Sequence, residues 1–205
     1  MSGYSPDRRA PHAAKPTTCN ARPALARRLH LPRQHGAGGI VAQWLGIHVP
    51  ERIDRLVPSN TAAHLGPTQY FDSAIAGLRK APDMQATAET FLRNWFPASM
   101  LELDNPAVEP FRRTLETTPR EGIIGSWAAV RDADLRRTIT VIAHPTLVIA
   151  GRHDTVTSAR HGEAPAAAIP GAKLHILDTV HPANVEQPEA FVERVLDFLA
   201  VHVAA

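Results

Sequence analysis

Two short polar segments follow predicted strands in the C-terminal third of the chain, and they carry the residue types of acid–base catalysis. Asp154 belongs to the segment GRHD, which follows the apolar run Thr146–Ala150 (TLVIA). A carboxylate at the carboxyl end of a parallel strand lies at the edge where open α/β sheets place their sites. Taken alone, Asp154 is more simply explained as a cap for the turn or helix that follows.

His181 occupies the matching position after the next predicted strand, Lys173–Leu177 (KLHIL). A carboxylate bonded to one ring nitrogen of a histidine fixes the tautomer and leaves the other nitrogen as a general base. A surface loop is the ordinary place for any one of the 11 histidines. The order strand–Asp–helix–strand–His–helix is much rarer than either part, so we predict that Asp154 and His181 form an acid–base pair. His153 is expected to be a structural neighbour, and Asp178 is the alternative carboxylate.

The elements around these segments indicate an α/β fold. Strand and helix alternate in the C-terminal third, as in proteins with a mostly parallel sheet. A helical block from Gln69 to about Arg137 contributes no strand to such a sheet, and we interpret it as an inserted cap or lid. The other predicted elements are a strand at Arg55–Asn60 and helices at Gly39–Val49, Ser158–Ile169 and Pro188–Val203.

Composition and charge exclude several classes of protein. The chain has 205 residues, 44% of them hydrophobic and 20% charged, and one cysteine, which excludes a disulfide framework. It has no run of about 18 apolar residues that could span a membrane. Residues 1–35 hold seven basic side chains, one acidic side chain and five prolines. We interpret them as a solvated, disordered leader rather than a targeting peptide or a nucleic-acid-binding arm, and we expect a cytoplasmic protein without nucleic-acid or membrane partners.

The last 60 residues, with TLVIAGRHD and HILDTVHPANVEQPEAFVERVLDFL, resemble the C-terminal part of an α/β-hydrolase. The stretches NTAAHLG and WAAVRDADLR narrow the resemblance to the 3-oxoadipate enol-lactonases of the β-ketoadipate pathway, and the similarity runs from about Gly38 to Leu199. The resemblance implies an incomplete α/β-hydrolase fold whose N-terminal third is missing or replaced. Residues 36–205 would form the partial hydrolase domain, with a helical cap at about 69–137.

The same resemblance assigns roles to individual residues. Asp154 would be the acid and His181 the base of a catalytic triad, while Trp127 and Arg131 in the cap would contact the substrate. The implied reaction opens an enol-lactone to 3-oxoadipate with water, without a cofactor or a metal ion. Ester or lactone small molecules are therefore the expected partners.

The sequence departs from the family at the nucleophile. These hydrolases carry G-x-S-x-G-G on a sharp strand-to-helix turn, and the resemblance places Gly36 where the serine belongs and Ala37 at the oxyanion-binding backbone position. Glycine has no hydroxyl and cannot form an acyl-enzyme. Ser59 is the serine nearest a predicted strand end, but its neighbours form no tight glycine turn. We expect Gly36→Ser alone to restore little activity, because the strained turn and a second oxyanion donor are also required.

We hypothesise that a disrupted reading frame accounts for both the leader and the missing serine. The residues Arg33–Gly36 can be encoded CGG-CAG-CAT-GGN, which one base later reads Gly-Ser-Met-Gly, close to the absent motif. The alternative to a hydrolase is therefore a catalytically inactive remnant or a binding protein from a frame-disrupted hydrolase gene. Without the upstream strands, the strand at Arg55–Asn60 is expected to lie at an open sheet edge.

Overall fold

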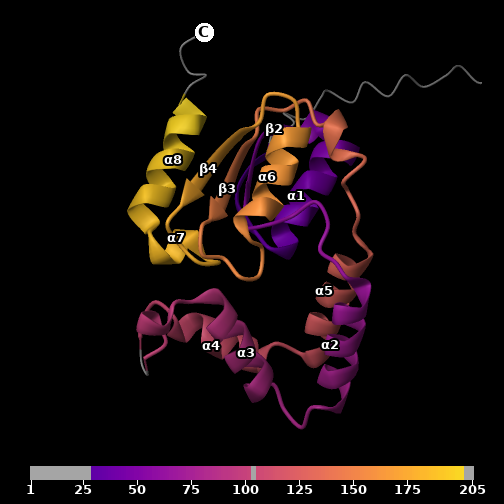
Figure 1. Ribbon diagram of the computed structural model, residues 1–205, viewed down its shortest axis with the longest axis vertical. Helices are drawn as coiled ribbons and strands as arrows, with labels where there is room; N and C mark the ends of the chain where they lie inside the picture. Colours follow the sequence, from indigo (N-terminus) through magenta and orange to yellow (C-terminus); the bar gives the residue numbers. More distant parts are fainter. Residues whose placement is uncertain (1–28, 103–104, 201–205) are drawn as a thin grey trace, which may run out of the picture.

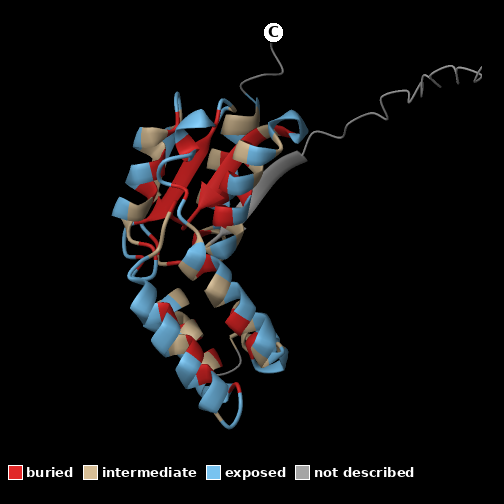
Figure 2. Ribbon diagram, turned by 90° about the vertical axis from the view of Figure 1, so that its right-hand side faces the viewer, coloured by how far each residue is buried: buried red, intermediate tan, exposed pale blue. Residues whose placement is uncertain are grey.

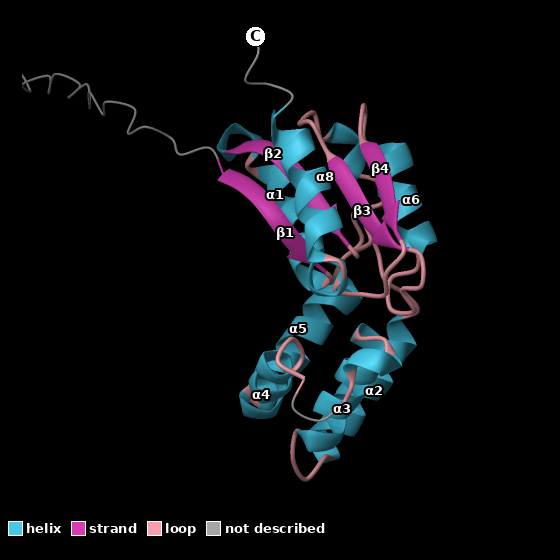
Figure 3. Ribbon diagram, turned by 90° about the vertical axis from the view of Figure 1, so that its left-hand side faces the viewer, coloured by secondary structure: helices cyan, strands magenta, loops and turns pink. Residues whose placement is uncertain are grey.

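A computed structural model describes residues 29–102 and 105–200, and its centre is a parallel four-stranded sheet. The strands are β1 (Leu29–His35), β2 (Ile53–Ser59), β3 (Leu147–Gly151) and β4 (Lys173–Leu177), in the spatial order β1-β2-β3-β4 (Figure 3). Every neighbouring pair is parallel. The predicted α/β class with a mostly parallel sheet is confirmed.

Helices cover both faces of this sheet, as a parallel sheet requires. On one face lie α1 (Ala37–His48) and α6 (Ala159–Ala168), and on the other lie α8 (Pro188–Ala200) and the short α7 (Ala183–Glu186) (Figure 1). Each face has its own apolar core: Ile40 and Leu56 belong to the core beside α1, and Ile149 and Phe191 to the core beside α8. The predicted end of the last helix, Val203, lies outside the described residues.

The strand β1 corrects the expectation for the N-terminal segment. Residues 29–35 fall within the expected leader, yet they pair with β2, so β2 is an inner strand and not the open edge. The register shifts between Leu31 and Gln34, so that Pro32 and Arg33 oppose Val57 alone. A bulge on an outer strand accommodates a proline, which has no N–H for the ladder. Residues 1–28, the rest of the expected leader, lie outside the described part.

A helical cap lies beyond the carboxyl ends of the strands (Figures 1 and 3). It contains α2 (Thr68–Lys80), α3 (Gln85–Trp95), α4 (Glu109–Thr117) and α5 (Arg120–Asp132). The helices pair as α2 with α5 and α3 with α4, and each pair encloses a small apolar core, visible as buried patches on the facing sides in Figure 2. Short 3₁₀ turns at Pro50–Arg52, Ala98–Met100 and Ile139–Val141 complete the described elements.

Candidate active site

Asp154 and His181 meet at the carboxyl edge of the sheet. Asp154 lies in the loop after β3 and His181 in the loop after β4, and His181 Nδ1 is 2.8 Å from Asp154 Oδ2. Both residues are buried, with exposed fractions of 3% and 6%. The expected juxtaposition is therefore present, because neighbouring parallel strands deliver their following loops to the same edge.

Asp154 accepts hydrogen bonds at both carboxylate oxygens. Oδ1 accepts the backbone N–H groups of Val156 and Thr157, each at 2.8 Å, and Oδ2 accepts the Thr157 hydroxyl at 2.7 Å. Burial by itself raises the pKa of Asp154, but the hydrogen bond and charge of His181, with the bonds from Asn60 and Thr157, outweigh it and lower the pKa. Asp154 is therefore held as a carboxylate that orients His181. The capping role and the pairing with His181 coexist.

Asn60, at the end of β2, connects three parts of the site. Its Nδ2 group donates to Asp154 Oδ2 at 3.0 Å and to the Val180 carbonyl at 3.2 Å, while its own carbonyl accepts the Gly36 N–H at 3.0 Å. The side chain is 1% exposed and the backbone has a φ of 45°, a left-handed conformation that asparagine tolerates. Asn60 was not predicted to belong to the site, although its position at a strand end is the signal that identified Asp154.

Gly36 occupies a sharp turn between β1 and α1. Its φ of 51° and ψ of −119° lie in a region that side-chain-bearing residues rarely adopt. A Cβ atom built on Gly36 would lie 3.6 Å from His181 Nε2. The strained turn expected to be lost is thus present in the backbone, because the Asn60 carbonyl and the first turn of α1 fix it. A side chain at position 36 would point at the free nitrogen of His181.

Two features make the beginning of α1 suitable for binding an oxyanion. Ala37 is the first residue of the helix and is exposed, and the N–H groups of a first helical turn have no partners within the helix. Gly39 allows the helix to approach the strand end, since a Cβ there would lie 2.4 Å from Thr61 Cγ2. The Thr61 hydroxyl in turn donates to the Gly36 carbonyl at 2.6 Å.

One aromatic side chain of the cap, Trp95, lies against His181, and two more continue from it. Trp95, the last residue of α3, stacks on the imidazole with ring centroids 6.1 Å apart. Phe91 lies 4.9 Å from the Trp95 ring and 5.7 Å from the Trp127 ring, so aromatic rings lead from His181 to Trp127. Trp127 lines a cavity of about 260 Å³ between α2, α3 and α5. No pattern in the sequence singled out Trp95.

Arg131, the other cap residue expected to contact substrate, is engaged elsewhere. Its guanidinium donates to Asp132 at 2.7 Å and to Asp72 of α2 at 2.8 Å. The hydrogen bond to Asp132, and after it the bond to Asp72, raises the pKa of Arg131 above its usual value. Arg131 therefore joins α5 to α2 on an exposed surface of the cap.

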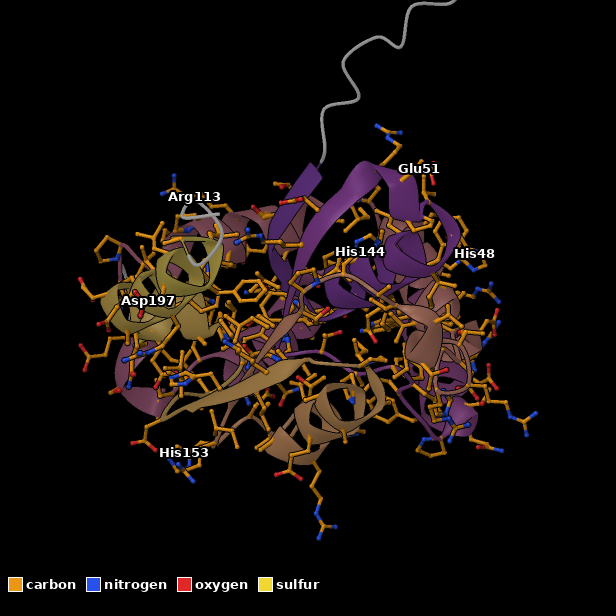
Figure 4. The ribbon with its side chains drawn as sticks, turned by 90° about the horizontal axis from the view of Figure 1, so that it is seen from above. His48, Glu51, Arg113, His144, His153 and Asp197 are labelled. Atoms are coloured by element: carbon orange, nitrogen blue, oxygen red, sulfur yellow. The ribbon has the colours of Figure 1, made fainter. Side chains whose placement is uncertain are left out.

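The remaining candidates lie apart from the pair. His153 Nε2 is 2.9 Å from Asp178 Oδ1, both side chains are largely exposed, and Figure 4 shows His153 at the rim of the molecule. Asp178 therefore pairs with His153 and not with His181. The Ser59 hydroxyl is buried and donates to Asn60 Oδ1 at 2.8 Å, so it is not a nucleophile.

Within residues 29–102 and 105–200, no three His, Cys, Asp or Glu side chains gather in a way that could hold a metal ion. In the same part of the chain, no helix is long and apolar enough to cross a membrane.

Comparisons with known proteins agree with this architecture. The chain is 36% identical over 154 residues to 3-oxoadipate enol-lactonase 2 of Acinetobacter baylyi, covering 75% of this chain and 57% of the relative. A hydrolase structure from Pseudomonas aeruginosa superposes with a TM-score of 0.77 at 56% identity over 79% of this chain and 61% of that one. The enol-lactonase structure from Burkholderia xenovorans superposes with a TM-score of 0.77 at 32% identity, over 81% of this chain and 64% of that one. No family model matches the sequence.

The chain belongs to the α/β-hydrolase superfamily. Within that superfamily, it is similar in sequence and in structure to 3-oxoadipate enol-lactonases. It spans less than two thirds of the length of these relatives.

Proposed function

We propose that the chain hydrolyses a carboxylic ester or lactone, with His181 as general base, Asp154 as its orienting carboxylate, and water in place of the missing serine. The observation that carries the proposal is the pair itself. His181 Nδ1 is held on Asp154 at 2.8 Å, and Nε2 faces the empty side-chain position of Gly36. The similarity to two enol-lactonases, those of Acinetobacter baylyi and Burkholderia xenovorans, favours 3-oxoadipate enol-lactone as the substrate and 3-oxoadipate as the product.

The reaction requires one proton transfer in each direction. His181 Nε2 takes a proton from a water molecule near position 36 while the water oxygen attacks the lactone carbonyl carbon. The Ala37 N–H at the beginning of α1 stabilises the negative oxygen that forms. The ring C–O bond then breaks, and the leaving oxygen takes the proton from His181. No cofactor takes part in these steps.

The expected rate enhancement is small for an enzyme. General-base catalysis contributes about 10²–10⁴-fold, whereas enzymes commonly reach about 10⁶-fold or more. The covalent route through an acyl-enzyme is closed, since Gly36 has no hydroxyl. Trp95 and the aromatic rings behind it supply an apolar wall for the carbon skeleton of the substrate.

The glycine at position 36 also favours the second candidate, a catalytically inactive binding protein or remnant of a hydrolase. Such a protein would retain the cap cavity beside Trp127 and bind an ester or lactone without converting it.

Lactone hydrolysis by matched histidine variants separates the two candidates. The full chain is incubated with 3-oxoadipate enol-lactone, and His181→Gln is compared with His153→Gln, which alters an exposed histidine of the preceding loop. We expect His181→Gln to abolish the rate above background and His153→Gln to preserve it. Equal rates in both variants and in the absence of protein would leave only the binding candidate.

A further inference from the structure

The site combines a fully oriented base with an empty position for its nucleophile. His181 is buried, with an exposed fraction of 6%, and its Nδ1 is hydrogen-bonded to Asp154. Its Nε2 has no hydrogen-bond partner among the described residues. A Cβ on Gly36 would meet that nitrogen at 3.6 Å and, apart from the two chain neighbours of Gly36, no other atom of the described residues within 4 Å.

We propose that the space between Gly36 and His181 accepts a small primary alcohol as nucleophile, so that the chain transfers acyl groups to alcohols as well as to water. This inference rests on the proposed function, because it uses the same base and the same oxyanion position.

The fit follows from the group that the site lacks. A serine side chain is itself a primary alcohol, and a carbon 3.6 Å from Nε2 is in ordinary van der Waals contact. The carbon of methanol or ethanol is not bonded to the protein, so it must stay at van der Waals distance from the Gly36 Cα, farther away than a bonded Cβ. Ala37 beside it is exposed, and the Cβ position of Gly36 meets no described residue within 4 Å other than His181 and its own chain neighbours, which leaves room at the side of that position. The stacked Trp95 ring adds an apolar surface that favours an alkyl group over bulk water.

In the transfer step, His181 is the only residue that accepts and returns a proton. The alcohol oxygen forms a bond to the ester carbonyl carbon, and its proton moves to Nε2. The bond between that carbon and the leaving oxygen then breaks, and the leaving group takes the proton from Nε2. The products are a new ester of the added alcohol and the released alcohol or phenol, with no oxidant or reductant involved.

Product partition tests the proposal. The full chain is mixed with p-nitrophenyl acetate in buffer containing methanol, and methyl acetate and acetate are measured by gas chromatography beside p-nitrophenol release. We expect methyl acetate to form about 10²-fold faster than in the absence of protein, the lower end of general-base catalysis. The fraction of methyl acetate among the products should exceed the fraction formed in the uncatalysed reaction. His181→Gln should remove the gain and His153→Gln should keep it.

Position 36 provides the steric control. Gly36→Ala places a carbon in the space that the alcohol would enter, so we expect methyl acetate formation to fall to the background rate. Since a side chain at a φ of 51° strains the backbone, the folding of this variant is checked by circular dichroism. If Gly36→Ala does not fold, His181→Gln decides the outcome.

Each result has a distinct meaning. Lactone hydrolysis with methanol incorporated only in the uncatalysed ratio overturns the alcohol site and leaves the proposed function intact. Methanolysis of p-nitrophenyl acetate without lactone hydrolysis supports the alcohol site and contradicts the lactone substrate. No reaction above background with either substrate overturns both.

Discussion

Replacing Asn60 by glycine is the sharpest test of how the site is held together. Glycine adopts the φ of 45° without strain, so the variant removes the side chain and keeps the turn. It deletes the bonds from Nδ2 to the Asp154 carboxylate at 3.0 Å and to the Val180 carbonyl at 3.2 Å. Ser59 also loses the acceptor of its buried hydroxyl.

The expected loss of stability follows from the charge of the groups to which Asn60 is hydrogen-bonded. A hydrogen bond to a charged group contributes about 1.5–3 kcal/mol and one between neutral groups about 0.5–1.5 kcal/mol. We therefore expect Asn60→Gly to lower the free energy of unfolding by about 2–4 kcal/mol, a large part of the total of about 5–15 kcal/mol that is typical of proteins. The matched control is Thr61→Val, which is equally buried and loses one neutral bond, to the Gly36 carbonyl. Its expected cost is about 1 kcal/mol.

Equilibrium urea unfolding measures both variants, and an NMR spectrum of the low-field Nδ1 proton of His181 reports on the site. We expect that proton signal to weaken or disappear in Asn60→Gly and to persist in Thr61→Val. Equal losses of stability in the two variants, with the signal unchanged in both, would refute the idea that Asn60 positions Asp154 and the loop carrying His181.

Three further outcomes are expected. Gly151→Ala would bring a Cβ to 2.3 Å from the Val180 carbonyl and 2.7 Å from that of Thr179; this overpacking should cost at least about 1–3 kcal/mol in urea unfolding, and an unchanged midpoint would contradict it. Asp154→Asn removes a carboxyl whose pKa is lowered on folding. The difference in free energy of unfolding between the original chain and this variant should be full above about pH 4 and should disappear as pH falls through the folded-state pKa of Asp154. A difference that does not change with pH would contradict this. Because the turn at Gly36 is present, contrary to the expectation from the sequence, Gly36→Ser should give a burst of p-nitrophenol from a side chain that faces His181. Turnover should follow about 10²–10³-fold more slowly than in a complete relative, because the described residues offer one oxyanion donor, the Ala37 N–H; a steady state without a burst would contradict the geometry.

The sequence was informative where one local pattern determined the structure. The run TLVIA and the run KLHIL are apolar enough to identify strands, and the rule that parallel strands end at one edge brought Asp154 and His181 together. The helical periodicity of the cap was equally clear, because surface helices repeat every 3.6 residues.

Other features depend on contacts that local patterns do not encode. The segment Leu29–His35 contains a proline and four polar or basic residues, and pairing with β2 overrides that composition. Asn60 and Trp95 acquire their roles only when strand ends and cap helices meet. The turn at Gly36 likewise depends on the Asn60 carbonyl, 24 residues away in the sequence.

The hydrogen bonds of Asn60 also have a consequence for folding kinetics. Its side chain joins residues 94 and 120 positions away along the chain, and closing such long loops costs entropy that local contacts do not repay. The pairing of α3 with α4 spans a much shorter stretch of chain and can form before those loops close. We therefore expect the geometry around His181 to become complete late in folding, after the local pairs of helices have formed.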